Sequence, residues 1–123
     1  MSKLIHATLS NKVLSCAFTV HKILGPGLLE SCYEGGMVVE LQQAGIPFQR
    51  QVVYPLCYKG EDIGGFIADL VVDNTIVLEL KSVQALCDAH VAQLLNYLRL
   101  SKCRVGYLMN FSNTSLEFKR YVF

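Results

Sequence analysis

The sequence has little excess of charge of either sign: 11 lysine and arginine residues stand against 10 acidic residues, which gives a net charge of +1. The broad basic field that is typical of nucleic-acid-binding proteins is therefore missing. A local basic patch remains open, so the charge balance neither supports nor excludes such a partner. The N-terminus lacks the apolar core of a signal peptide, and no apolar run reaches membrane-spanning length. We expect a soluble, cytoplasmic protein with no membrane partner.

Several chemical signatures are missing as well. The 5 cysteines are odd in number and form no C-x-x-C pair, which favours reduced thiols in the cytoplasm over a disulfide framework. The 3 histidines have no metal-ligand spacing. P-loop and dinucleotide-binding fingerprints are absent. What the sequence does have is a globular composition, with 52% hydrophobic residues over 123 positions, and we expect one domain spanning residues 1–123.

Hydrophobic periodicity predicts eight elements in the order α-α-β-β-β-α-β-β, which is that of an α/β protein. The expected helices cover residues 4–24, 28–44 and 88–101, with Asp88 as the cap of the last one. The expected strands cover residues 48–58, 63–72, 75–81, 104–111 and 116–123, with a turn at 59–62. The Gly35-Gly36 pair within the second helix suggests either close packing against another element or a local weakness.

The most strand-like stretch, IADLVVDNTIVLELKS at residues 67–82, carries charge where its neighbours are apolar. Because strand side chains alternate between faces, Glu79 and Lys81 project to the same side, and Asp69 can join them from the neighbouring strand. Two adjacent carboxylates repel each other, and a divalent ion such as Mg²⁺ or Mn²⁺ would remove that repulsion. Lys81 could then polarise an attacking water or stabilise charge on a phosphate. The alternative is a cross-strand salt bridge on a solvated sheet face.

The turn between these strands decides whether the two acids can meet. A two-residue Asp73-Asn74 turn would place Asp69 opposite Leu78 and therefore on the face away from Glu79. A shift of one residue reverses the face. We therefore predict either a three-residue connection over residues 73–75 or a β-bulge between Asp69 and Glu79.

Two helices carry polar side chains that could complete such a site. His90, Gln93 and Tyr97 follow one stripe of the third helix, which we expect to pack back onto the sheet. A solvent-exposed helix edge is the alternative. Glu30 and Glu34 lie one turn apart near the start of the second helix, where Glu30 also suits the helix dipole.

Together these residues resemble a known family. Gly27-x-x-Glu30-x-x-Tyr33, Asp69, Glu79-Leu-Lys81 and Gln93-x-x-x-Tyr97 are similar to the motifs of small bacterial and archaeal GxxExxY proteins, which are assigned to the PD-(D/E)XK nuclease superfamily. The likeness extends from Val20-His21 to Asn110-Phe111. It departs from the pattern at Ala68, where a proline often precedes the aspartate.

The resemblance implies a restriction-endonuclease-like core, with a mixed central sheet flanked by helices. It implies Asp69, Glu79 and Glu30 as metal ligands, Lys81 as the catalytic lysine, and Gln93 and Tyr97 as residues that support the site and contact DNA. The expected function is Mg²⁺- or Mn²⁺-dependent hydrolysis of DNA. One alternative is an inactive nucleic-acid- or protein-binding module that keeps the fold. Another is a structure-selective nuclease that resolves junctions as a homodimer.

Overall fold

A computed structural model describes residues 6–123 and confirms the predicted order of elements. The three helices are α1 (Ala7–Leu24), α2 (Glu30–Gln43) and α3 (Asp88–Ser101). The strands are β1 (Phe48–Tyr58), β2 (Glu61–Val72), β3 (Ile76–Lys81), β4 (Val105–Asn110) and β5 (Glu117–Val122). Residues 4 and 5 of the expected first helix lie outside the described residues.

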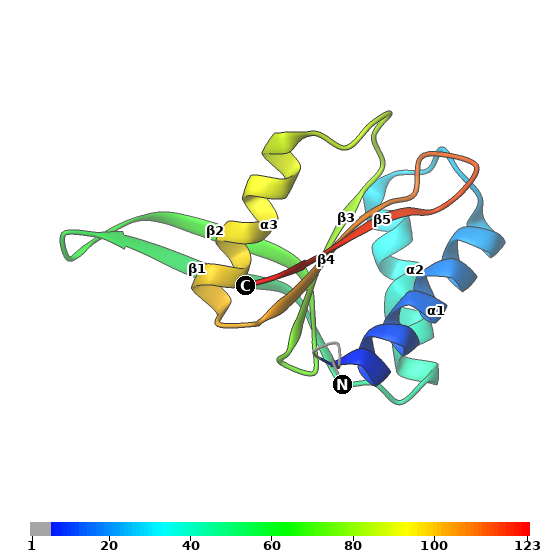
Figure 1. Ribbon diagram of the computed structural model, residues 1–123, viewed down its shortest axis with the longest axis horizontal. Helices are drawn as coiled ribbons and strands as arrows, with labels where there is room; N and C mark the ends of the chain where they lie inside the picture. The colour runs from blue at the N-terminus through cyan, green and yellow to red at the C-terminus, as the bar shows by residue number, and fades with distance from the viewer. Residues whose placement is uncertain (1–5) are drawn as a thin grey trace, which may run out of the picture.

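The five strands form one mixed sheet in the order β1-β2-β3-β4-β5. Helix α3 connects β3 to β4, which are parallel, and the other neighbouring pairs are antiparallel. Helices α1 and α2 cover one face of the sheet and α3 covers the other (Figure 1). The expected α/β core with a mixed sheet flanked by helices is therefore confirmed. None of the helices in residues 6–123 combines the length and the apolarity that crossing a membrane would require.

Apolar burial divides between the two faces of the sheet. The larger cluster joins α1 and α2 to side chains such as Leu70, Leu78 and Leu80, and the smaller one joins α3 to Val71, Val77 and Leu108. Because residues 77 and 78 belong to opposite clusters, the charged neighbours in β3 must fit a strand that is buried on both sides. Glu79 is 2% exposed.

The glycine pair in α2 behaves as two different positions. A Cβ on Gly36 would lie 2.9 Å from Val20 Cγ1 in α1, whereas a Cβ on Gly35 would meet no atom within 4 Å. Close packing therefore explains Gly36 and not Gly35. The loop before α2 is held by the buried Tyr33, whose hydroxyl donates to Gly25 O at 2.6 Å and accepts from Leu28 N at 3.1 Å.

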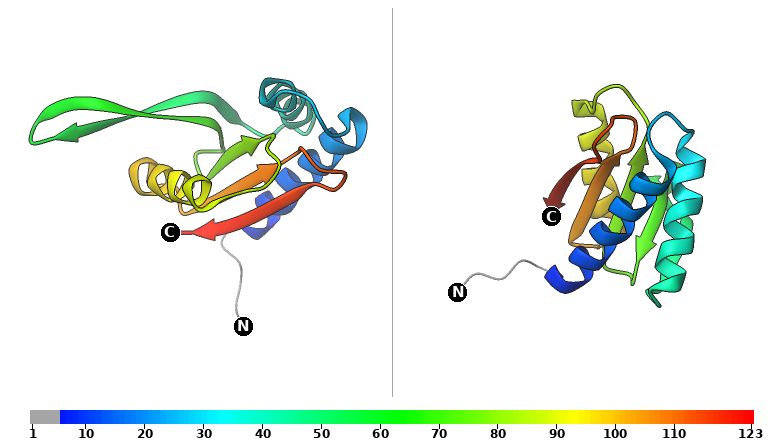
Figure 2. Two further views of the ribbon diagram at one scale, coloured as in Figure 1. Left: turned by 90° about the horizontal axis from the view of Figure 1, so that it is seen from above. Right: turned by 90° about the vertical axis from the view of Figure 1, so that its right-hand side faces the viewer.

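Strands β1 and β2 form a long hairpin that projects beyond the rest of the sheet (Figure 2). Its loop is Lys59-Gly60, with positive φ at both residues, as a tight hairpin requires. The expected four-residue turn was therefore too long, because Glu61 and Asp62 already pair with β1.

The β2–β3 connection confirms the three-residue alternative. Val72 pairs with Ile76 and Leu70 with Leu78, so residues 73–75 are left out of the ladder. Asp73 and Asn74 both have positive φ, and Thr75 N donates to Val72 O at 2.9 Å. Thr75 is the additional residue, and β3 begins one position later than predicted. Continued from Leu70↔Leu78, the same register sets Asp69 opposite Glu79.

The start of α3 differs from the prediction by one residue. Cys87 is the N-cap and Asp88 is the first helical residue. His90 Nδ1 accepts the Cys87 N–H at 3.1 Å and lies 3.6 Å from its Sγ. His90 therefore belongs to the helix cap and not to the polar stripe that faces the sheet. Asp88 still lies in the first turn, where its charge suits the helix dipole.

Candidate active site

Asp69 and Glu79 lie side by side on adjacent strands, as the register requires. Asp69 N donates to Glu79 Oε1 at 3.1 Å, and Leu80 N donates to Asp69 Oδ2 at 2.8 Å. Each carboxylate thus accepts a backbone N–H of the partner strand. The regular β2–β3 ladder ends at Leu70↔Leu78, so the two acids stand directly beyond the last regular pair of the two strands.

The backbone around Asp69 is irregular. Ala68 and Leu70 would share a face of a regular strand, yet Leu70 belongs to the core under α1 and α2 and Ala68 to the core under α3. On β1, Gln51 has φ 49°, and its pairing with Asp69 is missing between Arg50↔Leu70 and Val52↔Ala68. Both strands therefore change faces here, and the hairpin turns away from the sheet. Asp69 lies at this change.

Burial shifts the acid–base chemistry of the pair. Removal from water, followed by the neighbouring Asp69 charge, raises the pKa of Glu79 from 4.5 to about 8. Burial also raises the pKa of Asp69, against the lowering effect of the Leu80 N–H. Buried carboxyl groups that share a site cannot both ionise readily. Without a cation beside them, the pair therefore retains a proton into the neutral range.

Lys81 follows Glu79 on β3 and is held by α3. Its Nζ donates to Gln93 Oε1 at 3.1 Å, and Gln93 Nε2 donates to the Tyr97 hydroxyl at 3.0 Å. Burial, with the charges of Glu79 and Asp69, raises the pKa of Tyr97 to about 12. The polar stripe of α3 thus faces the Lys81 end of β3 through Gln93 and Tyr97, as predicted, and the Tyr97 hydroxyl stays protonated.

Glu30 reaches the same end of β3 from the first turn of α2. Its Oε2 accepts the Ser82 N–H at 3.2 Å, and Ser82 Oγ donates to Leu28 O at 2.7 Å. The negative charge of Glu30 contributes to the raised pKa of Asp69. Glu30 therefore lies at the edge of the candidate site, with one carboxylate oxygen bound to the backbone.

The sequence predicted neither the partners of Glu34 nor the burial of Asn110, two buried polar residues near the site. Glu34 accepts hydrogen bonds from Arg50 and Gln51 on β1. Asn110, which is fully buried, pairs with Lys81 in the β3–β4 ladder and binds both the N–H and the C=O of Val83. It thereby fixes the loop that leaves the candidate site. A polar residue ending an otherwise apolar strand was the signal in the sequence for Asn110.

The donor set suits a hard divalent cation in part. Asp69 and Glu79 present carboxylate oxygens, which Mg²⁺ and Mn²⁺ prefer, and a cation would offset the burial and the neighbouring negative charges that raise their pKa values. Over residues 6–123, no group of three or more histidine, cysteine, aspartate or glutamate side chains is close enough to hold a metal ion. The acidic pair fits such an ion, while Glu30 stands apart from it in this conformation.

A family model of the PD-(D/E)XK nuclease superfamily matches residues 7–121. The chain belongs to this superfamily. Its members generally use divalent metal ions. In this PD-(D/E)XK protein, Glu79-Leu80-Lys81 has the E-x-K form that the name contains, and Ala68 stands before Asp69 where the name has a proline. No curated protein matches the sequence.

Solved structures share the fold. The crystal structure of SSO0001 aligns with a TM-score of 0.60 and 20% identity over 94% of this chain and 58% of that one. An alkaline exonuclease (LHK-Exo) from Laribacter hongkongensis aligns with a TM-score of 0.55 and 10% identity, over 99% of this chain and 72% of that one. The PD-(D/E)XK protein thus spans little more than half the length of SSO0001. At these identities the likeness concerns the fold.

Proposed function

We propose that this PD-(D/E)XK protein hydrolyses phosphodiester bonds of DNA with the help of Mg²⁺ or Mn²⁺. The observation that carries the proposal is the β2–β3 register, which sets Asp69 beside Glu79, with Lys81 held next to them by Gln93. The name of LHK-Exo, an alkaline exonuclease of similar fold, supports nucleic acid as the substrate class. We further propose that the chain is a member of the GxxExxY type. Its Gly27, with φ 91°, and its Tyr33 shape the loop that presents Glu30.

In this proposal Asp69 and Glu79 would hold the divalent ion, with Glu30 as a third carboxylate ligand in place of its bond to Ser82 N. The chemistry that the ion supplies when bound is polarisation of the phosphodiester and a lower pKa of water. Lys81 places a positive charge where negative charge develops on phosphorus-bound oxygens. Gln93 fixes the position of this ammonium group, which is otherwise mobile at the end of a four-carbon side chain.

Tyr97 completes this arrangement from α3. Its hydroxyl accepts from Gln93 and keeps its own proton, since its pKa is about 12. It can therefore donate to an acidic or phosphate oxygen beside the pair. Fixed donors that face developing charge need no reorganisation during the reaction, which is where much of their catalytic effect arises.

The test is cleavage of plasmid, linear and single-stranded DNA by the purified protein in Mg²⁺ or Mn²⁺, with EDTA as the metal-free control. We expect cleavage by the wild type and its loss in D69N, E79Q and K81M. Each substitution keeps approximate size, so circular dichroism should show folded protein. Equal cleavage by the wild type and all three variants would point to a contaminating nuclease and contradict the proposal.

A non-catalytic nucleic-acid-binding module is the second candidate. The observation that favours it is the absence, within the described part of the chain, of a third acid grouped with Asp69 and Glu79. Such a module would bind DNA without cleaving it in any divalent metal. Paired nicks in a four-way junction would instead identify a junction-resolving homodimer.

A further inference from the structure

Arg50 is held in an unusual way for a half-exposed cation. Its Nε and Nη2 donate to Glu34 Oε2 at 3.1 and 3.0 Å, while the Gln51 amide donates to Glu34 Oε1 at 2.6 Å. The Glu34 side chain is 11% exposed and that of Arg50 48%. A surface pair of this kind usually contributes little stability, but a buried acid fixes the guanidinium in one orientation.

The orientation leaves donors available for a ligand. A guanidinium has five N–H donors, and only the Nε and Nη2 edge has a partner within the described residues. Nη1 has none. A planar guanidinium recognises phosphate oxygens with two parallel hydrogen bonds. Arg50 therefore presents a pre-oriented phosphate donor whose other edge is anchored in the protein.

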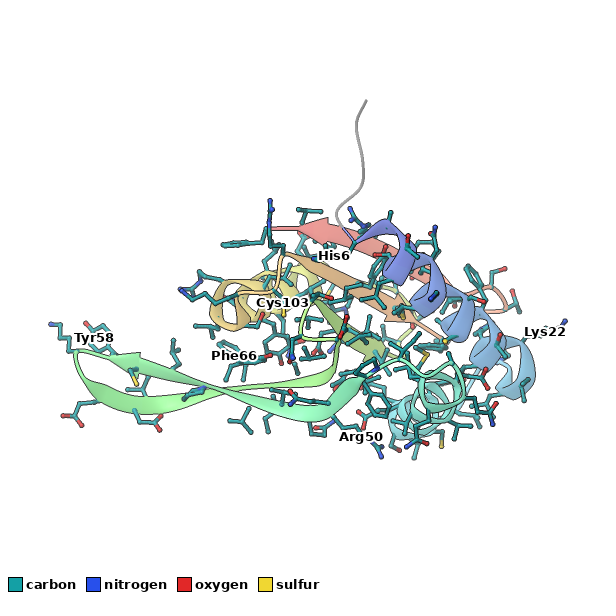
Figure 3. All side chains as sticks on the ribbon, turned by 90° about the horizontal axis from the view of Figure 1, so that it is seen from below. His6, Lys22, Arg50, Tyr58, Phe66 and Cys103 are labelled. Atoms are coloured by element: carbon teal, nitrogen blue, oxygen red, sulfur yellow. The ribbon has the colours of Figure 1, made fainter. Side chains whose placement is uncertain are left out.

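Its position places that donor beside the acidic pair. Arg50 pairs with Leu70, the residue after Asp69, and Gln51 stands across from Asp69 at the break in the ladder. Glu34 lies close enough for its charge to raise the pKa of Asp69. In Figure 3, Arg50 lies at the α2 end of the β1–β2 hairpin, far from Tyr58 at its tip. The cation is thus next to the site and not on the distant part of the hairpin.

Negative charge around the site makes a second fixed cation useful for binding DNA. Glu30, Glu34 and the Asp69–Glu79 pair still carry negative charge at the place where a DNA strand would approach, although the pair retains one proton and Glu34 is bound to Arg50. When one phosphate of a DNA strand lies at Lys81, the neighbouring phosphates of that strand contact the protein surface on either side. Without a second fixed cation there, those phosphates would meet mostly acidic side chains, which opposes binding.

We propose that Arg50, oriented by Glu34 and Gln51, binds a backbone phosphate next to the one that is cleaved. The inference rests on the proposed function, because it assigns a binding residue to the same substrate. It implies that this contact is independent of base sequence, since phosphates position a strand without specifying it. Arg50 therefore contributes to the affinity for the DNA strand and to its position on the protein, whereas the acids and Lys81 act at the bond that is cleaved.

The experiment measures binding of a fluorescein-labelled oligothymidylate by fluorescence anisotropy across a range of NaCl concentrations. The protein carries D69N to prevent cleavage, and the buffer contains EDTA. Against this background, R50Q should weaken binding roughly tenfold, as loss of a charged hydrogen bond does, and reduce the salt slope by about 0.7, the value for one phosphate on a single strand. R50K should retain most of the slope and lose part of the affinity. K59Q at the hairpin tip should change neither.

A purely structural role gives a different pattern. R50Q leaves Glu34 buried without its cation, which lowers stability, and E34Q/R50Q removes that charge. We expect the double variant to regain thermal stability and still to bind with the reduced slope. Recovery of wild-type binding in E34Q/R50Q, an unchanged slope in R50Q, or an equal loss in K59Q would overturn the proposal. So would absence of oligothymidylate binding by the D69N protein.

Cleavage by the Arg50 wild type is measured separately in Mg²⁺. Cleavage with an unchanged slope in R50Q contradicts the role of Arg50 and leaves the nuclease proposal standing. Binding with the expected slopes but without cleavage by the wild type contradicts the nuclease proposal and leaves Arg50 as a phosphate-binding residue of a binding module.

Discussion

Glu79 costs stability at its position, because it is 2% exposed and faces a second carboxyl group. The Asp69 N–H donates to one of its oxygens. Retaining an ionisable group under these conditions is typical of functional sites. The same reasoning applies to Asp69, which is half-buried and accepts the Leu80 N–H.

Glu79→Gln should therefore stabilise the metal-free protein at pH 8. An amide of the same size removes the buried charge and keeps an acceptor for Asp69 N. We expect a gain in the free energy of unfolding on the order of 2 kcal/mol, measured by urea denaturation in EDTA. Glu61→Gln, an exposed acid on β2, is the matched control and should change little. A clear loss of stability in E79Q would instead indicate a structural salt-bridge network.

Residue identity could be predicted where chemistry and spacing coincide. Asp69, Glu79 and Lys81 were predicted because charge interrupts apolar strands. The pairing of Glu34 with Arg50 was not predicted, since it joins α2 to β1 across the fold. Sequence spacing carries no information on such a contact. Ser82 escaped for the same reason, as its backbone bond to Glu30 links residues far apart in the chain.

At the scale of elements, α3 is the support of the site. Gln93 and Tyr97 lie one turn apart, and their hydrogen bonds end at Lys81. Gln93→Ala should release the lysine, and Tyr97→Phe should remove a donor while keeping the buried ring. We expect both to lower kcat for DNA cleavage by at least about tenfold, in the range of a single lost electrostatic donor.

Mn²⁺ affinity, measured by calorimetry, should be nearly unchanged in these two variants because neither residue is an acid of the pair. Asn96→Ala, on the exposed side of α3 with Arg99 as its partner, serves as the control and should keep its kcat. A wild-type kcat in both Q93A and Y97F would contradict a role of this polar stripe in the site.

The α1–α2 contact gives a second test with an internal control. Gly36→Ala places a Cβ 2.9 Å from the stiff, buried Val20 side chain, whereas Gly35→Ala meets no atom within 4 Å. Gly35→Ala should raise the free energy of unfolding by up to about 1 kcal/mol through helix propensity. Gly36→Ala should gain less or lose stability through overpacking. Equal gains in both variants, measured by thermal denaturation, would contradict the close approach of the helices.

Element boundaries were predicted least well, and the reasons are local. The hairpin tip was expected to be longer because Glu61 and Asp62 are polar, but an exposed hairpin end accepts polar residues on both faces. Cys87 was overlooked as a cap because a cysteine takes the place of the usual serine or aspartate, and because His90, three residues later, accepts the Cys87 N–H in place of the usual glutamate or glutamine. The register of β2 and β3 could be predicted, because a site that uses both acids needs them on one face of the sheet, and only a few connections between the two strands place them there.

For the whole molecule, the buried acids make stability depend on pH. The folded pKa of Glu79, about 8, lies above its ordinary value of 4.5, so between these values the folded state binds more protons than the unfolded state. Stability then falls as pH rises through this window. We expect the Tm of the metal-free protein to decrease from pH 5 to about pH 8, and E79Q to flatten that dependence.

Divalent metal should reverse this trend, because binding replaces the retained proton. Addition of Mn²⁺ should raise Tm more at pH 8 than at pH 5 in the wild type, by preferential binding to the folded state. Ca²⁺-free buffer with Na⁺ at equal ionic strength is the control. A pH-independent Tm in EDTA, or a larger Mn²⁺ effect at pH 5, would contradict the coupled acidic pair.

The order of elements, both helical layers and the mixed sheet were accessible from pattern and resemblance, since each element has a strong hydrophobic period. The change of faces at Gln51 and Asp69 was not. It depends on a positive φ at a glutamine and on the packing of the hairpin against α3. Such long-range packing sets the direction of the hairpin without leaving a sequence pattern.

Occupation of the acidic pair by a divalent ion is the central claim, and a Mn²⁺ soak of wild-type crystals tests it most directly. The account predicts an anomalous difference peak between the carboxylates of Asp69 and Glu79, which is lost in E79Q crystals soaked in the same way. A wild-type map without a peak at this position, or a peak that persists unchanged in E79Q, would contradict it.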